Sequence, residues 1–149
     1  MKICINDNVN VASKCKGLID ILHLGQTDMD PNEAKKLIDQ NIQIGLSITD
    51  EIQLDNIPDC ISYLGVGPIF PTGSKIDASE PMGSNTLKEI INKTNLPVVA
   101  IGGISIDSIC GLFKLGVSGV AVISAILNEN NPIENFQKIK ENIIKGTKK

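Results

Sequence analysis

Residues 98–124, VVAIGGISIDSICGLFKLGVSGVAVIS, place two apolar runs on either side of a segment with helical character. Each run is apolar nearly throughout, which is typical of strands in a parallel sheet that is covered on both faces. The segment between them extends from Ser105 to Gly116, and a glycine at that position is suited to end a helix. The stretch therefore predicts a β-α-β unit, whose two strands are parallel because a helix connects them.

The same unit repeats along the chain. The apolar runs that we expect to be strands occupy residues 2–7, 19–25, 42–48, 61–70, 96–103 and 118–124. The segments that we expect to be helices occupy residues 11–19, 31–39, 86–93, 105–116 and 131–146, with 51–57 as a weaker candidate. In the segment 11–19, the spacing predicts one apolar face made of Val11, Cys15, Leu18 and Ile19. About six β-α units predict an α/β fold with a parallel sheet, in a single domain over residues 1–149.

Two parallel architectures fit this pattern. One is a doubly wound open sheet, in which helices cover both faces. The other is a (β/α)8 barrel, which needs eight units and usually about 250 residues. Since the chain offers six units, the pattern of elements leaves both architectures open.

Composition and charge exclude several classes of function. The chain is 42% hydrophobic and 21% charged, as expected of a globular protein, and its net charge of −3 gives no support for binding nucleic acid. No apolar run approaches the roughly 20 residues that span a bilayer, and the run in MKICINDN is too short for a signal peptide. The four cysteines are too far apart in sequence to suggest a zinc site. We therefore expect a cytoplasmic protein with neither a membrane nor a nucleic acid as partner.

Polar and small residues follow the expected strands, at the edge where parallel α/β proteins bind their ligands. In chain order these strand ends are Asn6–Asp7, Gly25–Asp28, Ser47–Thr49, Pro71–Lys75, Gly102–Ser105 and Ile123–Ser124. The first two ends carry carboxylates, and the remaining ends carry hydroxyls, glycines and one lysine. This distribution predicts that the edge handles an anionic ligand.

The residue types at this edge suit a metal ion and phosphate groups. Asp7 and Asp28 match Mg²⁺, which takes one or two protein carboxylates and completes its shell with water and phosphate oxygens. Gly102 and Gly103 allow a close backbone approach, and a helix that starts near Ser105 points free N–H groups at an anion. The residues alone therefore predict a phosphate-handling α/β enzyme that uses Mg²⁺.

Each of these features also has a plainer interpretation. A Gly-Gly pair after a strand is often only a turn, and Asp7 could cap the next turn. Lys75 by itself would usually be a surface lysine. His23, in the middle of a strand, is more readily a hydrogen-bonded interior histidine than a catalytic base. What favours the functional interpretation is that all the candidate ligand groups share one edge of the sheet.

Several motifs resemble thiamine phosphate synthases in their order and approximate spacing. They are IND at 5–7, HLGQTD at 23–28, GLS at 45–47, YLGVGPIFPTGSK at 63–75, VVAIGGI at 98–104 and GVAVISAI at 119–126. The thiazole tautomerase branch of the same superfamily shares much of this pattern. That branch relies on a histidine after the strand containing GxS, where this chain has Ile48 and Thr49, so the synthase branch is preferred.

The resemblance implies an incomplete (β/α)8 TIM barrel and an activity. The family joins hydroxymethylpyrimidine diphosphate to a thiazole phosphate and releases pyrophosphate, a step of thiamine biosynthesis. By resemblance, Asp7 and Asp28 would hold Mg²⁺, and Lys75 and Ser47 would be the catalytic residues. The diphosphate side would be contacted by Asn6, Ser47 and Lys75. The thiazole phosphate side would be contacted by Thr72, Ser74, Gly103, Ile123 and Ser124.

The sequence departs from the family at one point. The family's first two β-α units have no counterpart here, and the resemblance places them before Met1. A sheet without them exposes two apolar edges, so we expect self-association or a complementing N-terminal chain. Two alternatives to the synthase follow. The chain could be a catalytically impaired remnant or partner subunit that only binds a phosphate ligand, or an enzyme of the thiazole tautomerase type.

Overall fold

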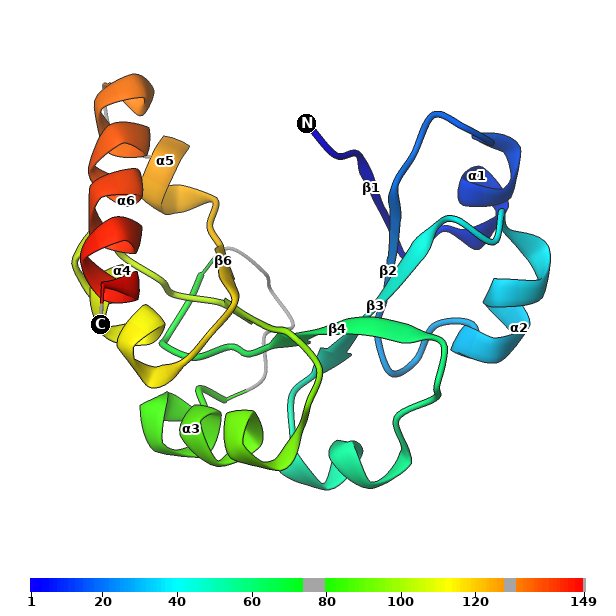
Figure 1. Cartoon of the computed structure of the whole chain (residues 1–149), viewed down its shortest axis with the longest axis horizontal. Coiled ribbons are helices and arrows are strands. Elements are labelled where there is room, and N and C mark those ends of the chain that lie inside the picture. Colours follow the sequence, from blue (N-terminus) through cyan, green and yellow to red (C-terminus); the bar gives the residue numbers. More distant parts are fainter. Residues whose placement is uncertain (74–79, 128–130, 149) are drawn as a thin grey trace.

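Six parallel strands form one curled sheet in the computed structural model, which describes residues 1–73, 80–127 and 131–148 (Figure 1). In sheet order the strands are β1 (Cys4–Asn6), β2 (Ile21–Leu24), β3 (Gln43–Ile48), β4 (Ile61–Val66), β5 (Val98–Ile101) and β6 (Gly119–Ala121). A doubly wound sheet reverses its strand order at a switch point, whereas this order follows the sequence from one edge to the other, as in a (β/α)8 barrel. The prediction of about six parallel units of such a barrel is confirmed.

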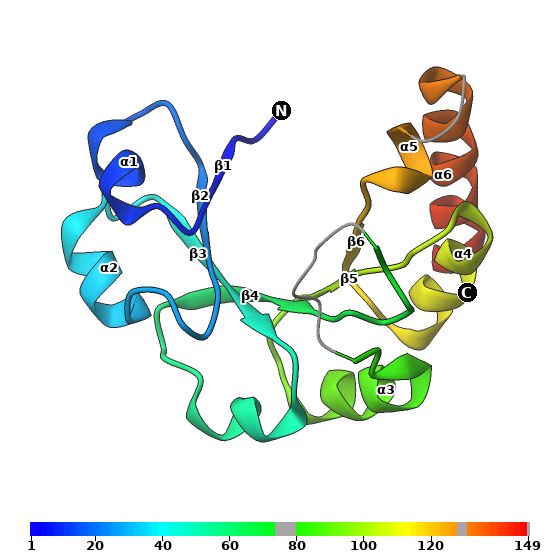
Figure 2. The same cartoon turned by 180° about the vertical axis from the view of Figure 1, so that it is seen from behind.

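The helices lie around the outside of the curled sheet (Figures 1 and 2). They are α1 (Val9–Lys14), α2 (Pro31–Leu37), the 3₁₀ helix η1 (Glu51–Asn56), α3 (Gly83–Lys93), α4 (Ile106–Leu115), α5 (Ser124–Leu127) and α6 (Pro132–Thr147). In the part of the chain that the structure describes, no helix has the length and apolar character needed to cross a membrane.

The two faces of the sheet differ in chemistry, because side chains alternate along each strand and register partners share a face. The outer face carries buried aliphatic residues such as Leu22, Ile44 and Leu64. The inner face carries polar or small residues, for example His23 on β2 and its partner Gly45 on β3. The expectation of strands covered on both faces therefore holds fully only for the outer face. On the inner face His23, Ser47 and Tyr63 are half-buried, and the glycines beneath them are buried.

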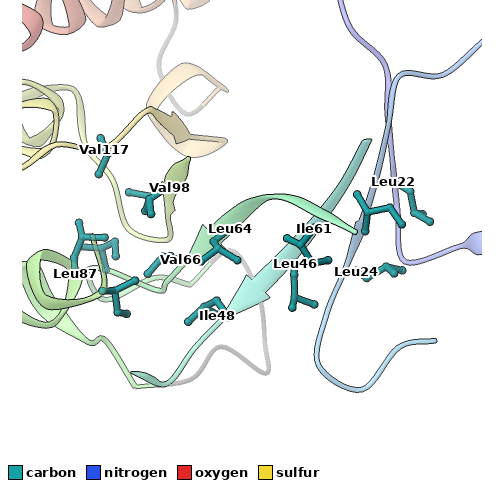
Figure 3. Packing of buried hydrophobic residues seen from close by; sticks show 14 of the residues in the cluster. Leu22, Leu24, Leu46, Ile48, Ile61, Leu64, Val66, Leu87, Val98 and Val117 are labelled. Carbon is teal, nitrogen blue, oxygen red and sulfur yellow. The ribbon is translucent and has the colours of Figure 1, made fainter. Parts of the chain in front are cut away.

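The hydrophobic core fills the space between the outer face and the helices (Figure 3). Leu46, Ile48, Leu64 and Val66 from the central strands are buried in it. Leu87 and Ile90 of α3, with Ile109 and Leu112 of α4, pack against the strands from the helix side and are likewise buried. This layer fixes the strands relative to one another and so determines where their carboxyl ends lie.

One predicted helix has different bounds and a different buried face. The helix α1 starts at Val9, because the Asn8 side chain accepts a hydrogen bond from the Val11 N–H at 3.0 Å and so caps it. The chain leaves the helix before Gly17, which has a left-handed φ of 73°. Val9 and Ala12 are buried, whereas Leu18 is 70% exposed. The predicted apolar face of Val11, Cys15, Leu18 and Ile19 was therefore wrong.

Two further differences concern the segments 51–57 and 118–124. The weak helix candidate at 51–57 is the 3₁₀ helix η1, whose first turn is capped by the Asp50 side chain. The last expected strand is shorter than predicted, since β6 ends at Ala121 and Ser124 begins the short helix α5. Ser124 therefore lies on a helix instead of at the end of a strand.

Candidate functional site

Asp7 follows β1 at the carboxyl edge of the sheet, as predicted. Its N–H donates to the His23 carbonyl at 2.8 Å, which ties the end of β1 to β2. Its φ of 64° lies in the left-handed region, which few residues other than glycine adopt. Backbone strain of this kind is found where the surrounding structure holds a residue in place, and it is common at functional sites.

Asp28 lies in the loop after β2, with its carboxylate turned back toward the strand. Its Oδ2 accepts a hydrogen bond from the Gly25 N–H at 2.6 Å. Burial lowers the pKa of His23, while the negative charges of Asp7 and Asp28 act on this pKa in the opposite direction. Both carboxylates therefore lie close enough to the same imidazole to interact with it electrostatically. The two residues predicted to hold a metal thus both lie near His23.

Ser47 and His23 meet on the inner face of the sheet. Ser47 Oγ lies 2.9 Å from His23 Nε2, and the other ring nitrogen, Nδ1, lies 2.8 Å from the Tyr63 hydroxyl. The His23 and Tyr63 rings are tilted by 35° with their centroids 5.4 Å apart. The expected hydrogen bonds of His23 are present, while the ring itself is half-buried on the inner face and not enclosed in the interior. One of its two partners is the serine that the resemblance predicts to contact the diphosphate.

Two glycines make room for this pair of rings. A Cβ at Gly45 would lie 2.2 Å from Tyr63 Cζ and 2.5 Å from His23 Nδ1. A Cβ at Gly65 would lie 2.8 Å from His23 Cε1. Such distances are far inside van der Waals contact. Any larger residue at Gly45 or Gly65 would therefore displace the rings from the face of the sheet.

Tyr63 and Gln26 are site residues that sequence reasoning missed. Burial, with a smaller contribution from the neighbouring Cys4 thiol, raises the pKa of Tyr63 to about 12, so its hydroxyl stays protonated. Gln26 Nε2 donates to the Ser47 carbonyl at 2.7 Å and joins the loop after β2 to the end of β3. The sequence did contain a signal for Tyr63. It is the chain's single tyrosine, and it lies near the start of a predicted strand whose other large residues are mostly aliphatic. Gln26 stands in HLGQTD two residues before Asp28, the predicted metal ligand.

Asn6 is the last residue of β1 and is exposed. It is the register partner of His23, so its side chain faces the same inner side of the sheet. Asn6, Asp7, Asp28 and Ser47 thus lie around His23, from three neighbouring strands or the loops that follow them.

The loops after β4 and β5 form the second half of the edge. The Ile69 N–H donates to the Ile101 carbonyl at 3.0 Å, and the Phe70 N–H donates to the Gly102 carbonyl at 3.1 Å. Gly103 has a φ of 65°, and a Cβ on it would lie 2.5 Å from the carbonyl oxygens of Phe70 and Pro71. The contact of the two loops thus requires glycine at this position, and it places Gly103 against the segment that leads into Thr72.

The remaining predicted residues belong to the far end of this edge or lie outside the described residues. Ile123 and Gly103 each lie two residues beyond the register pair of Ala121 with Ile101, so they follow neighbouring strands at the same level. Ile123 is 63% exposed. Ser124 follows it at the start of α5. Ser74 and Lys75 lie outside the described residues.

A metal ion at this edge would depend on few protein ligands. Within residues 1–73, 80–127 and 131–148, no three His, Cys, Asp or Glu side chains gather into a group that could hold a metal. Asp7 and Asp28 offer hard carboxylate oxygens, which suit Mg²⁺ better than softer metals. Two carboxylates fit an ion whose other ligands come from water and from substrate phosphate.

Comparison with known proteins agrees with this arrangement. The family profile described as thiamine monophosphate synthase matches residues 1–126. The thiamine-phosphate synthase of Lactococcus lactis subsp. lactis is 40% identical over 140 residues, which are 93% of this chain and 64% of that protein. The thiamine-phosphate synthase of Vibrio parahaemolyticus is 43% identical over 133 residues, 87% of this chain and 63% of that protein. This chain thus spans a little under two thirds of the length of these curated relatives.

Solved structures show the same fold. A thiamine phosphate pyrophosphorylase from Pyrococcus furiosus superposes with a TM-score of 0.86 at 30% identity, covering 99% of this chain and 69% of that one. A structure named KGPDC from Streptococcus mutans superposes with a TM-score of 0.68 at 19% identity, which shows a shared fold alone. The matched profile, the sequence relatives and the curled parallel sheet agree, and the chain belongs to the thiamine monophosphate synthase family.

Proposed function

We propose that the chain carries the metal-binding and thiazole-phosphate parts of a cytoplasmic thiamine phosphate synthase. The observation that supports this most is the grouping of Asp7, Asp28 and Ser47 around His23 at one edge of the sheet. That edge belongs to a chain 40% identical to an enzyme of this name. The substrates would be hydroxymethylpyrimidine diphosphate and a thiazole phosphate, and pyrophosphate would be released.

The proposed reaction exchanges one bond for another. The C–O bond between the pyrimidine methylene and the diphosphate breaks, and its electron pair leaves with pyrophosphate. The lone pair of the thiazole nitrogen then forms the new C–N bond to the methylene carbon. Since the nitrogen that attacks carries no proton, no general base is needed, and catalysis depends on stabilising the charge of the leaving group.

The residues divide between the two substrates. Asp7 and Asp28 would hold Mg²⁺, whose positive charge would stabilise the departing pyrophosphate. Asn6, Ser47 and Lys75 would bind the diphosphate, and Lys75 would add a mobile positive charge. The thiazole phosphate would be bound by Thr72, Ser74, Gly103, Ile123 and Ser124. The close packing of Gly103 against the Phe70 and Pro71 carbonyls supports this second group, because it joins two of its loops.

The two outer strands of the sheet, β1 and β6, support an interaction with further β-α units. Within the described residues β1 pairs with β2 alone and β6 with β5 alone. A hollow of about 600 Å³ lies beside β6, lined by Phe113, Val120, Ile126, Phe136 and neighbouring residues. We propose that these edges take up two β-α units from a complementing chain or associate with a second copy. Analytical ultracentrifugation tests the second copy, because a monomer at micromolar concentration would exclude it.

Binding and turnover test the proposed function. Calorimetric titration with pyrophosphate, with and without Mg²⁺, measures the metal-dependent half-site, and titration with thiazole phosphate measures the other. Turnover is then measured with both substrates, for the chain alone and after mixing with the part of the Lactococcus lactis relative that it does not match. If pyrophosphate does not bind with Mg²⁺ and neither sample forms product, the synthase proposal fails.

The same experiment distinguishes the alternative function. The second candidate is an impaired remnant or partner subunit, and the outer strands β1 and β6, each paired on one side alone within the described residues, support it. That candidate predicts binding of a phosphate ligand without turnover in either sample. A thiazole tautomerase-type enzyme would convert its substrate without pyrimidine diphosphate, so a thiazole tautomer assay separates it from both.

A further inference from the structure

We infer that Tyr63 is a positioning residue that acts through His23 to hold the Ser47 hydroxyl as a hydrogen-bond donor toward an anionic substrate. This inference rests on the proposed function, in which Ser47 contacts the diphosphate. The three side chains form one line across the inner face of the sheet. The Tyr63 hydroxyl is 2.8 Å from His23 Nδ1, and Ser47 Oγ is 2.9 Å from His23 Nε2.

A neutral imidazole has one N–H, so this line of hydrogen bonds has two possible directions. If Nδ1 accepts from the Tyr63 O–H, then Nε2–H donates to Ser47 Oγ, and the serine hydrogen is left for another acceptor. If Nδ1–H donates to Tyr63, then Nε2 accepts the Ser47 hydrogen, and the serine offers only lone pairs. Only the first direction provides a donor for a phosphate oxygen.

The surroundings of Tyr63 select the first direction. Its hydroxyl lies beside the Cys4 thiol, a weak acceptor, and beside Nδ1, a strong one. The thiol has an acceptor of its own, because Cys4 Sγ donates to the Ile5 carbonyl at 3.6 Å. The Tyr63 hydrogen therefore goes to Nδ1, which places the imidazole hydrogen on Nε2 and turns the Ser47 hydrogen away from the ring.

The sheet is built to hold this line in place. His23, Gly45 and Tyr63 are register partners across β2, β3 and β4, and Ser47 is the partner of Gly65 one level further along. The two glycines leave the space that the rings occupy, since a Cβ at either would lie under 3 Å from a ring atom. Gln26 holds the Ser47 backbone through its carbonyl. The position of Ser47 is thus fixed independently, and Tyr63 determines only the direction of its hydrogen.

The tautomer of His23 can be measured directly, because the chain contains one histidine. In a ¹⁵N-labelled sample, the two imidazole nitrogen shifts report which nitrogen carries the hydrogen. We expect the Nε2–H form in the parent chain near pH 7.5. We expect a mixture of both forms in Tyr63→Phe, which keeps the ring and removes the donor. A parent chain in the Nδ1–H form would overturn the inference, even if the variant failed to fold.

A double-mutant cycle connects the tautomer to binding. Pyrophosphate affinity in the presence of Mg²⁺ is measured for the parent chain, Tyr63→Phe, Ser47→Ala and the double variant. We expect Ser47→Ala to weaken binding about tenfold, as for loss of one hydrogen bond to a charged group. We expect Tyr63→Phe to weaken it only about twofold, because an equal mixture of tautomers leaves about half of the chains with the donor, and to have no effect when Ser47 is already alanine. Additive losses would show that Tyr63 does not act through Ser47 and would overturn the inference. A parent chain that does not bind pyrophosphate would reject the proposed function, whereas the tautomer remains measurable.

Discussion

Ser47 and His23 lie on neighbouring strands, 24 residues apart in sequence, with 2.9 Å between Ser47 Oγ and His23 Nε2. This contact joins β2, which leads into the loop that carries Asp28, to the end of β3, which carries Ser47. It depends on glycine at two neighbouring positions, Gly45 and Gly65, because their missing side chains leave the space for the imidazole. Even an added methyl group at Gly45 or Gly65 should therefore change the geometry of the candidate site.

Gly45→Ala should destabilise the protein by about 1–3 kcal/mol, the usual cost of overpacking. The added methyl group would lie 2.2 Å from Tyr63 Cζ, so the ring has to move. Urea unfolding measures the loss. Gly111→Ala is the matched control, because Gly111 is in α4 with open space around it and should gain about 0.5–1 kcal/mol from helix propensity. Equal effects of the two substitutions would contradict the packing argument.

Gly103→Ala should cost about 2–4 kcal/mol, because it combines a left-handed φ with contacts of 2.5 Å to the Phe70 and Pro71 carbonyls. Gly17→Ala separates these two causes. Its φ is 73°, but a Cβ there would have no neighbour within 4 Å, so we expect a loss of only about 1 kcal/mol. Thermal unfolding of the two variants side by side measures the difference, and a larger loss at Gly17 would refute the proposed contact between the loops.

The stability of the chain should decrease as the pH falls below about 6.5, the ordinary histidine pKa. Burial lowers the pKa of His23 in the folded state, so between the two pKa values the unfolded chain binds a proton that the folded chain does not. The stabilisation is complete above the unfolded pKa and is lost toward the folded pKa. Urea unfolding at pH 7.5 and 5.5 tests this, together with an NMR titration of His23. A titration midpoint above 6.5 would reverse the sign and refute the prediction.

The strand ends could be predicted from the sequence, and the inner face of the sheet could not. Asp7, Asp28 and Ser47 were predicted because each ends an apolar run or lies in the loop just after one, and the ends of parallel strands share one edge. Tyr63 was missed because its partner depends on the register between β3 and β4, which shifts between Ile44 and Gly45. The order of residues within one strand gives no information about how that strand is aligned with its neighbour, so the shift could not be predicted.

The glycine pair after β5 shows a similar limit. The sequence predicted that Gly102 and Gly103 remove side chains so that a backbone could approach a ligand. In the structure both have left-handed φ values, and the backbone that approaches them is the chain's own segment of Pro68 to Pro71. That contact joins loops about 30 residues apart, so it depends on the barrel topology and not on the local sequence.

Asp28→Asn should weaken Mg²⁺-dependent binding of pyrophosphate by at least tenfold while leaving the fold intact, because a charged metal ligand becomes neutral. The amide oxygen of asparagine can still accept the hydrogen bond that Asp28 Oδ2 receives from the Gly25 N–H, so the loop should keep its shape. Asp20→Asn is the matched control. Asp20 also accepts a backbone hydrogen bond, from the Ile3 N–H at 2.8 Å, but it precedes β2 and lies at the opposite edge of the sheet. Calorimetry at fixed Mg²⁺ compares the two variants with the parent chain. If Asp20→Asn reduced the affinity as much as Asp28→Asn, the effect would come from net charge, and Asp28 would lose its role as a metal ligand.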